Sequence, residues 1–216
     1  MNAGSERFTR LWLVCGLVAP AFLMAVLIVL GQITPDYDPI SQTISLMGTA
    51  DRPYAWVLNG SYAVYGVLMG VAALGLSRST VFPRVSKRAA ILLAVHAVGT
   101  VLLGIFPDSN TSPTQHVVHD VVSGLSYAPL LGGILVFRSA ARQSRALKLA
   151  GIIGLAVVVL NMPMPFLTRF DPYTGLLQRS LAGAAYCWLA GAFALLYRKR
   201  RQFRPTVAAS GDPVLQ

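Results

Sequence analysis

Six stretches of this chain are apolar over the length of a membrane span, and this feature constrains the fold more than any other. They cover residues 11–31, 55–76, 89–106, 116–137, 147–167 and 178–197. A helix needs about 20 apolar residues to cross a hydrocarbon core of about 30 Å, and each stretch is near that length. Of the 216 residues, 55% are hydrophobic and only 12% are charged. We therefore predict an all-α fold, a polytopic membrane bundle of six transmembrane helices with no separate soluble domain.

The positive charges predict how these helices are oriented. Of the 18 Lys and Arg residues, 15 lie before the first span, between spans two and three, between spans four and five, or after the last. The other three are Arg52, Arg169 and Arg179. Cytoplasmic loops carry the excess of Lys and Arg, so both termini should be cytoplasmic and the protein should lie in the cell membrane. Residues 1–10 would be a cytoplasmic N-terminus, 11–197 the transmembrane domain, and 198–216 a basic, disordered tail. This distribution favours membrane lipid as the partner of the basic residues and argues against nucleic acid.

The first outer loop, residues 32–54, carries signals for a short helix. Asp38 suits the N-cap, Pro39 the first helical position and Gly48 the exit. We expect a short amphipathic helix over 39–47 that lies on, or dips into, the outer face of the bundle. Its apolar and hydroxyl-bearing faces would be made by Ile40, Ile44 and Met47 and by Ser41 and Ser45.

A polar stripe opens the fourth span. The capping box Ser112-Pro113-Thr114-Gln115 precedes a helix on which four polar residues recur at i, i+3, i+4 and i+7. These residues are His116, His119, Asp120 and Ser123. Ionisable residues inside a transmembrane helix are costly and usually functional. The alternative is a capped helix start whose side chains bond to neighbouring loops. Because Asp120 lies one turn deeper than His116, we expect it to be buried and to touch a His, an Arg or an ion.

Other polar residues are expected near this stripe. Asp108 follows Phe106-Pro107, and the connection 107–112 is too short to separate it from the stripe. We predict that the side chains of Asp108, His119 and Asp120 converge on one outer-half cavity, with Asn59, Ser45 and Arg179 close by. Arg179 could clamp an anionic group, or could extend to lipid headgroups instead. His96 lies in the middle of the third span, where a lone His most often hydrogen-bonds across helices.

Two chemistries suit the stripe. His116, His119 and Asp120 could hold a divalent metal, or a carboxylate could orient an imidazole that acts as a general acid or base. The sequence does not decide between them, nor whether the protein is an enzyme.

Four segments carry a resemblance to a known family. They are Ile44-Ser45-Leu46-Met47-Gly48, Asn59, Gly104-Ile105-Phe106-Pro107-Asp108 and His119-Asp120-Val121-Val122-Ser123. They resemble the family catalogued as domain of unknown function 998, which implies a bacterial or archaeal membrane protein of about six helices over residues ~10–200. A more distant similarity is to membrane hydrolases such as alkaline ceramidases, but this chain lacks their late HxxxH. A three-His zinc site is therefore in doubt.

These observations lead to one favoured function and two alternatives. The favoured one is a membrane enzyme or binding protein acting on a lipid or another amphiphile at the outer leaflet. It would use Asp108, His119 and Asp120 as acid, base or ligand groups. The first alternative is a transporter or channel subunit with a proton-linked His/Asp pair, and the second is a structural partner in a membrane complex. The oligomeric state is left open.

Overall fold

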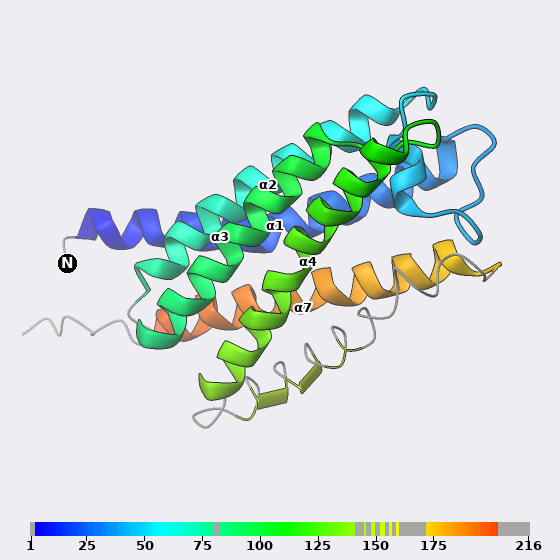
Figure 1. Cartoon of the computed structure of the whole chain (residues 1–216). Helices are drawn as coiled ribbons and strands as arrows, with labels where there is room; N and C mark the ends of the chain where they lie inside the picture. The colour runs from blue at the N-terminus through cyan, green and yellow to red at the C-terminus, as the bar shows by residue number, and fades with distance from the viewer. Residues whose placement is uncertain are drawn as a thin grey trace, which may run out of the picture.

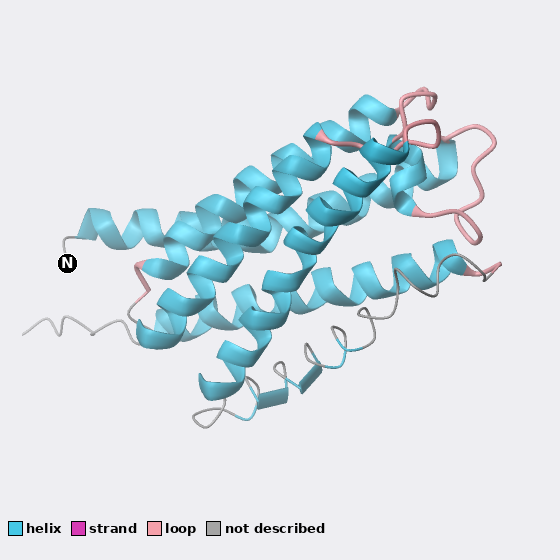
Figure 2. Ribbon diagram, in the orientation of Figure 1, coloured by secondary structure: helices cyan, strands magenta, loops and turns pink. Residues whose placement is uncertain are grey.

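The computed structural model describes residues 3–79, 83–140 and 172–202, together with the single positions 145, 148, 149, 152, 153, 156 and 159. Within these residues the chain is helical, with no strand (Figure 2). The elements are α1 (Ala3–Ile33), the 3₁₀ helix η1 (Ile44–Gly48), α2 (Ala55–Ser77), α3 (Pro83–Ile105), α4 (Pro113–Ala140) and α7 (Thr174–Gln202). Helices α1 to α4 pack each against the next, and α7 packs against α1 (Figure 1). The all-α prediction is confirmed.

Four of these helices are long and apolar enough to cross a membrane. They are Leu11–Ile33, Ala55–Ser77, Ser86–Ile105 and Thr174–Arg198. The expected span 116–137 lies within α4, which is not among the four, and the expected span 147–167 lies outside the described residues. The structure therefore supports a helical membrane protein, whereas the count of six spans is not supported.

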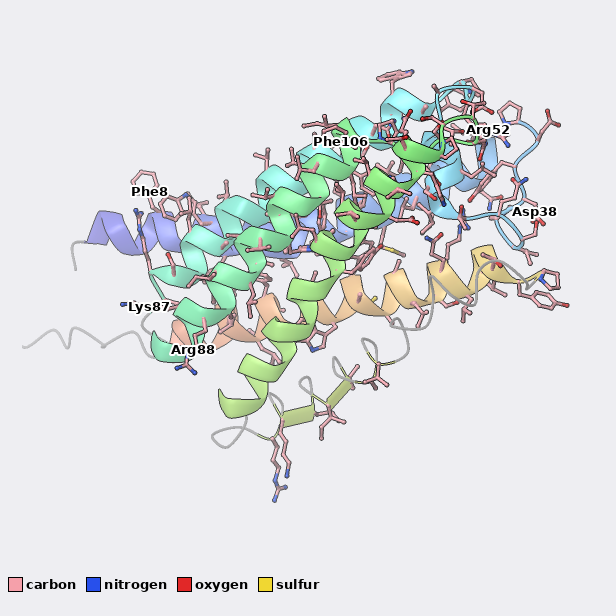
Figure 3. All side chains as sticks on the ribbon, in the orientation of Figure 1. Phe8, Asp38, Arg52, Lys87, Arg88 and Phe106 are labelled. Atoms are coloured by element: carbon pink, nitrogen blue, oxygen red, sulfur yellow. The ribbon has the colours of Figure 1, made fainter. Side chains whose placement is uncertain are left out.

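The bundle has one basic end and one acidic end. The start of α1, the connection between α2 and α3 and the end of α7 lie together at one end (Figure 1), where Figure 3 shows Lys87 and Arg88. We call this the basic end. Asp38 and Arg52 lie at the opposite end (Figure 3), which also holds the connection between α3 and α4. We call this the acidic end. Both ends of the described chain thus lie at the basic end of the bundle.

Small residues bring α2, α3 and α4 close together. A Cβ atom on Gly66 of α2 would lie 2.6 Å from the carbonyl oxygen of Ala97 on α3. A Cβ on Gly99 of α3 would lie 2.7 Å from the backbone nitrogen of Ser126 on α4. Lipid is as apolar as the helices, so such close packing supplies much of the attraction between membrane helices. These contacts fix how α3 and α4 align, and this alignment positions the polar residues described below.

The first loop at the acidic end differs from the prediction. The short helix expected over 39–47 is present only in part, because the chain forms a turn at 39–41 and then the short helix η1 at Ile44–Gly48. Asp38 does cap the turn, since its carboxylate accepts the backbone N–H groups of Ile40 and Ser41 at 3.0 and 3.3 Å. Ile44 and Met47 are buried as expected, but Ile40 is 48% exposed.

Helix α7 explains why the turn does not continue as a helix. The backbone N–H of Leu176 donates to the carbonyl of Ile40 at 2.8 Å, and the backbone N–H of Ile44 donates to the Gln178 side chain at 2.6 Å. Arg179 donates hydrogen bonds to two further backbone carbonyls of the loop, as described below. These bonds use the backbone groups that an α-helix would pair internally. Tertiary contacts to α7 therefore override the local helix signals.

Candidate functional site at the acidic end

The connection between α3 and α4 places the acidic residue of the site. Helix α4 begins at Pro113, and the hydroxyl of Ser112 accepts the backbone N–H of Gln115 at 3.3 Å. The Gln115 side chain donates to the carbonyl of Pro107 at 3.0 Å, and so ties the connection to the first turn of α4. The adjacent Asp108 is thereby held beside the polar stripe, as the short connection predicts.

Asp108 and His116 form a close pair. Nδ1 of His116 lies 2.7 Å from Oδ1 of Asp108, and the Asp108 side chain is only 14% exposed. Burial raises the pKa of Asp108, but hydrogen bonds from His116 and from the Ser109 backbone N–H outweigh it and hold that pKa below its ordinary value. The carboxylate therefore stays ionised and fixes the orientation of the imidazole.

A second carboxylate faces the other nitrogen of this imidazole. Oδ2 of Asp120 lies 3.6 Å from Nε2 of His116, so the ring lies between two carboxylates. Asp120 thus contacts a histidine as expected, but its expected burial is wrong, because its side chain is 63% exposed. The reason is its helix face: Val117 and Val121, on either side of it, are also exposed. That face of α4 turns away from α3.

His119 is oriented by the backbone of the neighbouring helix. Its Nδ1 lies 3.0 Å from the carbonyl oxygen of Phe106, and its side chain is buried. A carbonyl only accepts hydrogen bonds, so Nδ1 carries the proton and, in the neutral ring, Nε2 bears the lone pair. His119 is therefore held in one tautomer, one helical turn further along α4 than His116.

Both arginines described at this end donate hydrogen bonds to backbone carbonyls. Nη1 of Arg179 donates to the carbonyls of Pro39, Gln42 and Gly175 at 2.9, 3.0 and 3.2 Å. Its Nη2 donates to the hydroxyl of Tyr37. Arg52 donates to the carbonyls of Pro35 and Asp36 at 3.0 and 3.3 Å. In the described part of the chain neither arginine forms an ion pair with Asp108 or Asp120.

The remaining predicted site residues divide between two neighbourhoods. The Asn59 side chain donates to the carbonyl of Gly48 at 3.0 Å, and the backbone carbonyl oxygen of Asn59 lies against Gly104 of α3. Asn59 therefore joins η1 to the outer turn of α3. Ser41 donates to the Asp38 carboxylate, and Ser45 pairs with the Thr43 hydroxyl at 3.2 Å, while Ser123 lies half-buried on α4. The expected shared site thus becomes a histidine–carboxylate cluster on α3 and α4 and an arginine-centred lock between α7 and the first loop.

The cluster does not have the geometry of the metal site considered above. Among the described residues no three His, Cys, Asp or Glu side chains lie close enough together to hold a metal ion. A metal held by His116, His119 and Asp120 does not fit these positions.

One group of polar residues was not identified from the sequence. His96 bonds across helices as expected, but its partners Tyr65, Thr100 and Ser126 were not singled out. A signal for one of them was available. Ser126 lies three residues beyond Ser123, so it continues the stripe of α4 by one further turn.

Comparison with known proteins gives one match. The family described as protein of unknown function (DUF998) matches residues 17–195. No curated protein and no solved structure matches the chain. The segments that carry the resemblance meet in the structure, since Gly48 contacts Asn59, Asn59 contacts Gly104, and Phe106 bonds to His119.

Proposed function

Since the chain belongs to the DUF998 family of proteins of unknown function, and the match includes Asp108 and His116, we propose a role for the acidic end of the bundle. The acidic end binds the polar headgroup of a lipid or another amphiphile, and the Asp108–His116 pair acts there as a proton acceptor and donor. The observation that carries this proposal is the position of the His116 ring between two carboxylates, 2.7 Å from Asp108 and 3.6 Å from Asp120.

The geometry of the pair suits proton transfer. A buried carboxylate that holds one ring nitrogen of a histidine fixes the orientation of the ring, and an imidazole oriented in this way can accept and donate protons. Nε2 of His116 lies 3.6 Å from Oδ2 of Asp120, and the His116 side chain is 40% exposed. A headgroup can therefore approach this nitrogen from the surface.

The charge of the cluster selects the headgroup. A protonated His116 between two ionised carboxylates has a net charge of −1, and Arg52 and Arg179 are engaged by backbone carbonyls. A positively charged ammonium group compensates this charge, whereas a bare phosphate is repelled. The ligand class we propose is an amphiphile with an ammonium headgroup, and an anionic ligand held by Arg179 is not favoured.

The distribution of Lys and Arg supports an orientation for this site. If the basic end faces the cytoplasm, as the positive-inside rule favours, the acidic end meets the outer leaflet of the cell membrane. Trp56, which is 75% exposed at the start of α2, suits the aromatic belt of that interface. In this orientation a lipid headgroup at the outer interface would lie beside His116.

Native mass spectrometry of the purified protein tests the proposal. Nanodiscs would contain equal amounts of phosphatidylethanolamine and phosphatidylglycerol, and the lipid retained by the protein would be identified. We expect retention of the ethanolamine lipid, reduced at least tenfold in Asp108→Asn and unchanged in Asp36→Asn. Asp36 is a matched control because it is an exposed carboxylate at the same end, in a left-handed conformation that Asn also adopts. Equal retention of both lipids, or equal retention by both variants, would contradict the proposal.

A specific observation favours one second candidate, a proton-linked transporter subunit. Polar side chains on α3 and α4 continue from the cluster to His96, deep in the bundle. A transport pathway needs polar groups at depth, and a headgroup-binding protein does not. Proton uptake into proteoliposomes, driven by a gradient of a candidate solute, distinguishes the two functions.

A further inference from the structure

The interface between α3 and α4 carries polar groups from the acidic end to the middle of the bundle. We call this set the α3–α4 seam. Its members are Asp108, Thr100 and His96 on the α3 side and His116, His119, Ser123 and Ser126 on α4. On α4 they recur every three or four residues, so they share one helix face.

The deep end of the seam is a buried histidine with both nitrogens engaged. Nδ1 of His96 lies 2.6 Å from the carbonyl oxygen of Ser126, and Nε2 lies 2.9 Å from the hydroxyl of Tyr65. Because the carbonyl only accepts, Nδ1 carries the proton, and Nε2 accepts the hydroxyl proton of Tyr65. His96 and Tyr65 are 2% and 0% exposed, so this pair is shielded from bulk water.

Two hydroxyl groups lie directly above His96. The Thr100 and Ser126 hydroxyls are 3.0 Å apart, and the Ser126 hydroxyl is 3.5 Å from Nδ1 of His96. Because the Thr100 hydroxyl donates to the backbone carbonyl of His96 at 2.9 Å, the Ser126 hydroxyl is the donor of this pair, and rotation of both hydroxyls reverses the direction. This reversal is what a chain of hydroxyls needs to pass a proton to or from a ring nitrogen.

The spacing on α4 connects these hydroxyls to the acidic end. At about 1.5 Å of rise per residue, the steps from His116 to His119, to Ser123 and to Ser126 are each about 4.5–6 Å. A step of this length is bridged by one water molecule or one change of side-chain rotamer. At the acidic end the seam reaches the surface through His116.

We propose that the α3–α4 seam is a proton path that connects His96 with the acidic end of the bundle. His96 is a proton-exchanging site within the membrane, in addition to its role in joining helices. On α3 the polar groups of the seam end at His96, because Leu93, Ala90 and Ala89, the described buried residues next toward the basic end, are apolar. Protons therefore enter and leave by the acidic end. The proposal does not depend on which headgroup the acidic end binds.

The exchange step balances within the network. One proton leaves Nδ1 of His96 for the Ser126 hydroxyl, the Ser126 proton passes to the Thr100 hydroxyl, and the Thr100 proton leaves outward along the seam to the acidic end, so each hydroxyl keeps one proton. Meanwhile the hydroxyl proton of Tyr65 shifts to Nε2, so the ring stays neutral and the negative charge rests on the Tyr65 oxygen. A proton returning along the seam restores Nδ1, and Tyr65 regains its own.

Among the described residues, the groups around His96 are uncharged. The Tyr65 ring lies 5.6 Å from both the His96 and the Tyr186 rings, and Tyr186 bonds to Tyr127 of α4. The two ion pairs of the described chain, His116 with Asp108 and His116 with Asp120, include no group that contacts His96. The competing interpretation is a static link among α2, α3 and α4. The two differ in how fast the Nδ1 proton exchanges with water.

Hydrogen–deuterium exchange at the His96 side chain separates these interpretations. The protein would be labelled with ¹⁵N-histidine and ¹⁵N-tryptophan in lipid bilayers, transferred to D₂O, and followed by solid-state NMR. The indole N–H of Trp188, which is also buried, serves as the internal reference. We expect the His96 Nδ1–H to exchange at least tenfold faster than this reference, and Ser123→Ala to slow it at least tenfold. The matched control Ser61→Ala should not, because the Ser61 hydroxyl bonds only to the Val57 carbonyl of its own helix.

Each outcome decides the proposal. Exchange as slow as that of Trp188 overturns it and leaves a static link. Fast exchange that Ser123→Ala and Thr100→Val both leave unchanged also overturns it, because the proton then moves by another route. If Ser123→Ala does not fold, Thr100→Val provides the same comparison, since Val keeps the shape of Thr and removes its hydroxyl. Loss of headgroup binding in Asp108→Asn without a change in His96 exchange would separate this path from the proposed ligand site.

Discussion

Replacing Arg179 with Ala should release the first loop from α7 while leaving the helices packed. Arg179 donates to the carbonyls of Pro39, Gln42 and Gly175 and to the hydroxyl of Tyr37. It also lies over the Tyr37 ring, 5.2 Å from the centroid. All of these partners except Gly175 lie in the first loop, so the substitution weakens the closed loop and does little to the contacts between helices.

The bonds give the size of the effect. Nη1 has only two hydrogens, so its three carbonyls count as two bonds, and the bond to Tyr37 makes a third. A hydrogen bond to a charged group contributes about 1.5–3 kcal/mol, and three at the lower figure give about 4–5 kcal/mol. Arg179 is half-buried, and water reaching the freed carbonyls compensates for part of this loss. We therefore expect loop opening to become easier by about 3 kcal/mol, which is about a 100-fold larger open population.

Limited proteolysis measures this population. Chymotrypsin cleaves after Tyr37, which is buried in the closed loop, and the detergent micelle protects sites within the spans. When the loop opens and closes faster than it is cleaved, the rate follows the open population. We expect cleavage after Tyr37 to be about 100-fold faster in Arg179→Ala, with fragments identified by mass spectrometry. Arg179→Lys should give an intermediate rate, because an ammonium group keeps the charge but cannot span the same set of acceptors.

The matched control is Arg198→Ala, which removes an exposed arginine from the same helix at the basic end. Its cleavage rate after Tyr37 should equal that of the wild type. A rate in Arg179→Ala within threefold of the wild type would refute the reasoning, because it would mean that Gln178 and Leu176 hold the loop without the guanidinium.

Three further predictions concern the helices and the cluster. Gly104→Ala should destabilise the protein by about 1–3 kcal/mol, because the new Cβ would meet a backbone oxygen of α2. Gly60→Ala, which has open space around it, should change the stability by about 1 kcal/mol or less. Thermal unfolding of both variants measures the difference. The lowered pKa of Asp108 means that its ionised form stabilises the fold above the ordinary pKa of 3.8, and that this contribution is lost as pH falls through the lower folded value. The wild type should therefore lose stability more steeply than Asp108→Asn below about pH 4, and equal slopes in acid unfolding would contradict this. Tyr65→Phe leaves Nε2 of His96 without its donor and should cost about 1–3 kcal/mol in unfolding free energy, and an unchanged melting temperature would show that another donor replaces it.

The sequence predicts the helices well where length and apolarity decide the structure. Four expected spans agree with apolar helices to within a few residues, because no soluble alternative accommodates about 20 consecutive apolar residues. The closeness of Asp108 to the stripe was also predictable, since six residues cannot carry it far from the start of α4. These predictions depend only on local sequence.

The first loop could not be predicted in this way. Asp38, Pro39 and Gly48 are genuine helix signals, and Asp38 does cap the turn. The competing partners lie more than 130 residues further along the chain on α7, and no local pattern indicates them. The role of Arg179 could not be predicted for the same reason. Its residue type and position suit the binding of an anion, but its actual acceptors are backbone carbonyls that only the folded loop presents.

The bonds between the first loop and α7 have a consequence for biogenesis. The loop is synthesised soon after α1, but Ile44 and Pro39 pair with Gln178 and Arg179, 134 and 140 residues later. Because the chain emerges from the ribosome in order, the loop lacks these α7 partners until α7 has been made and inserted. A truncated product that stops before α7 would expose an unclosed loop to proteases at the membrane surface. The closing of this loop thus reports that α7 has been inserted.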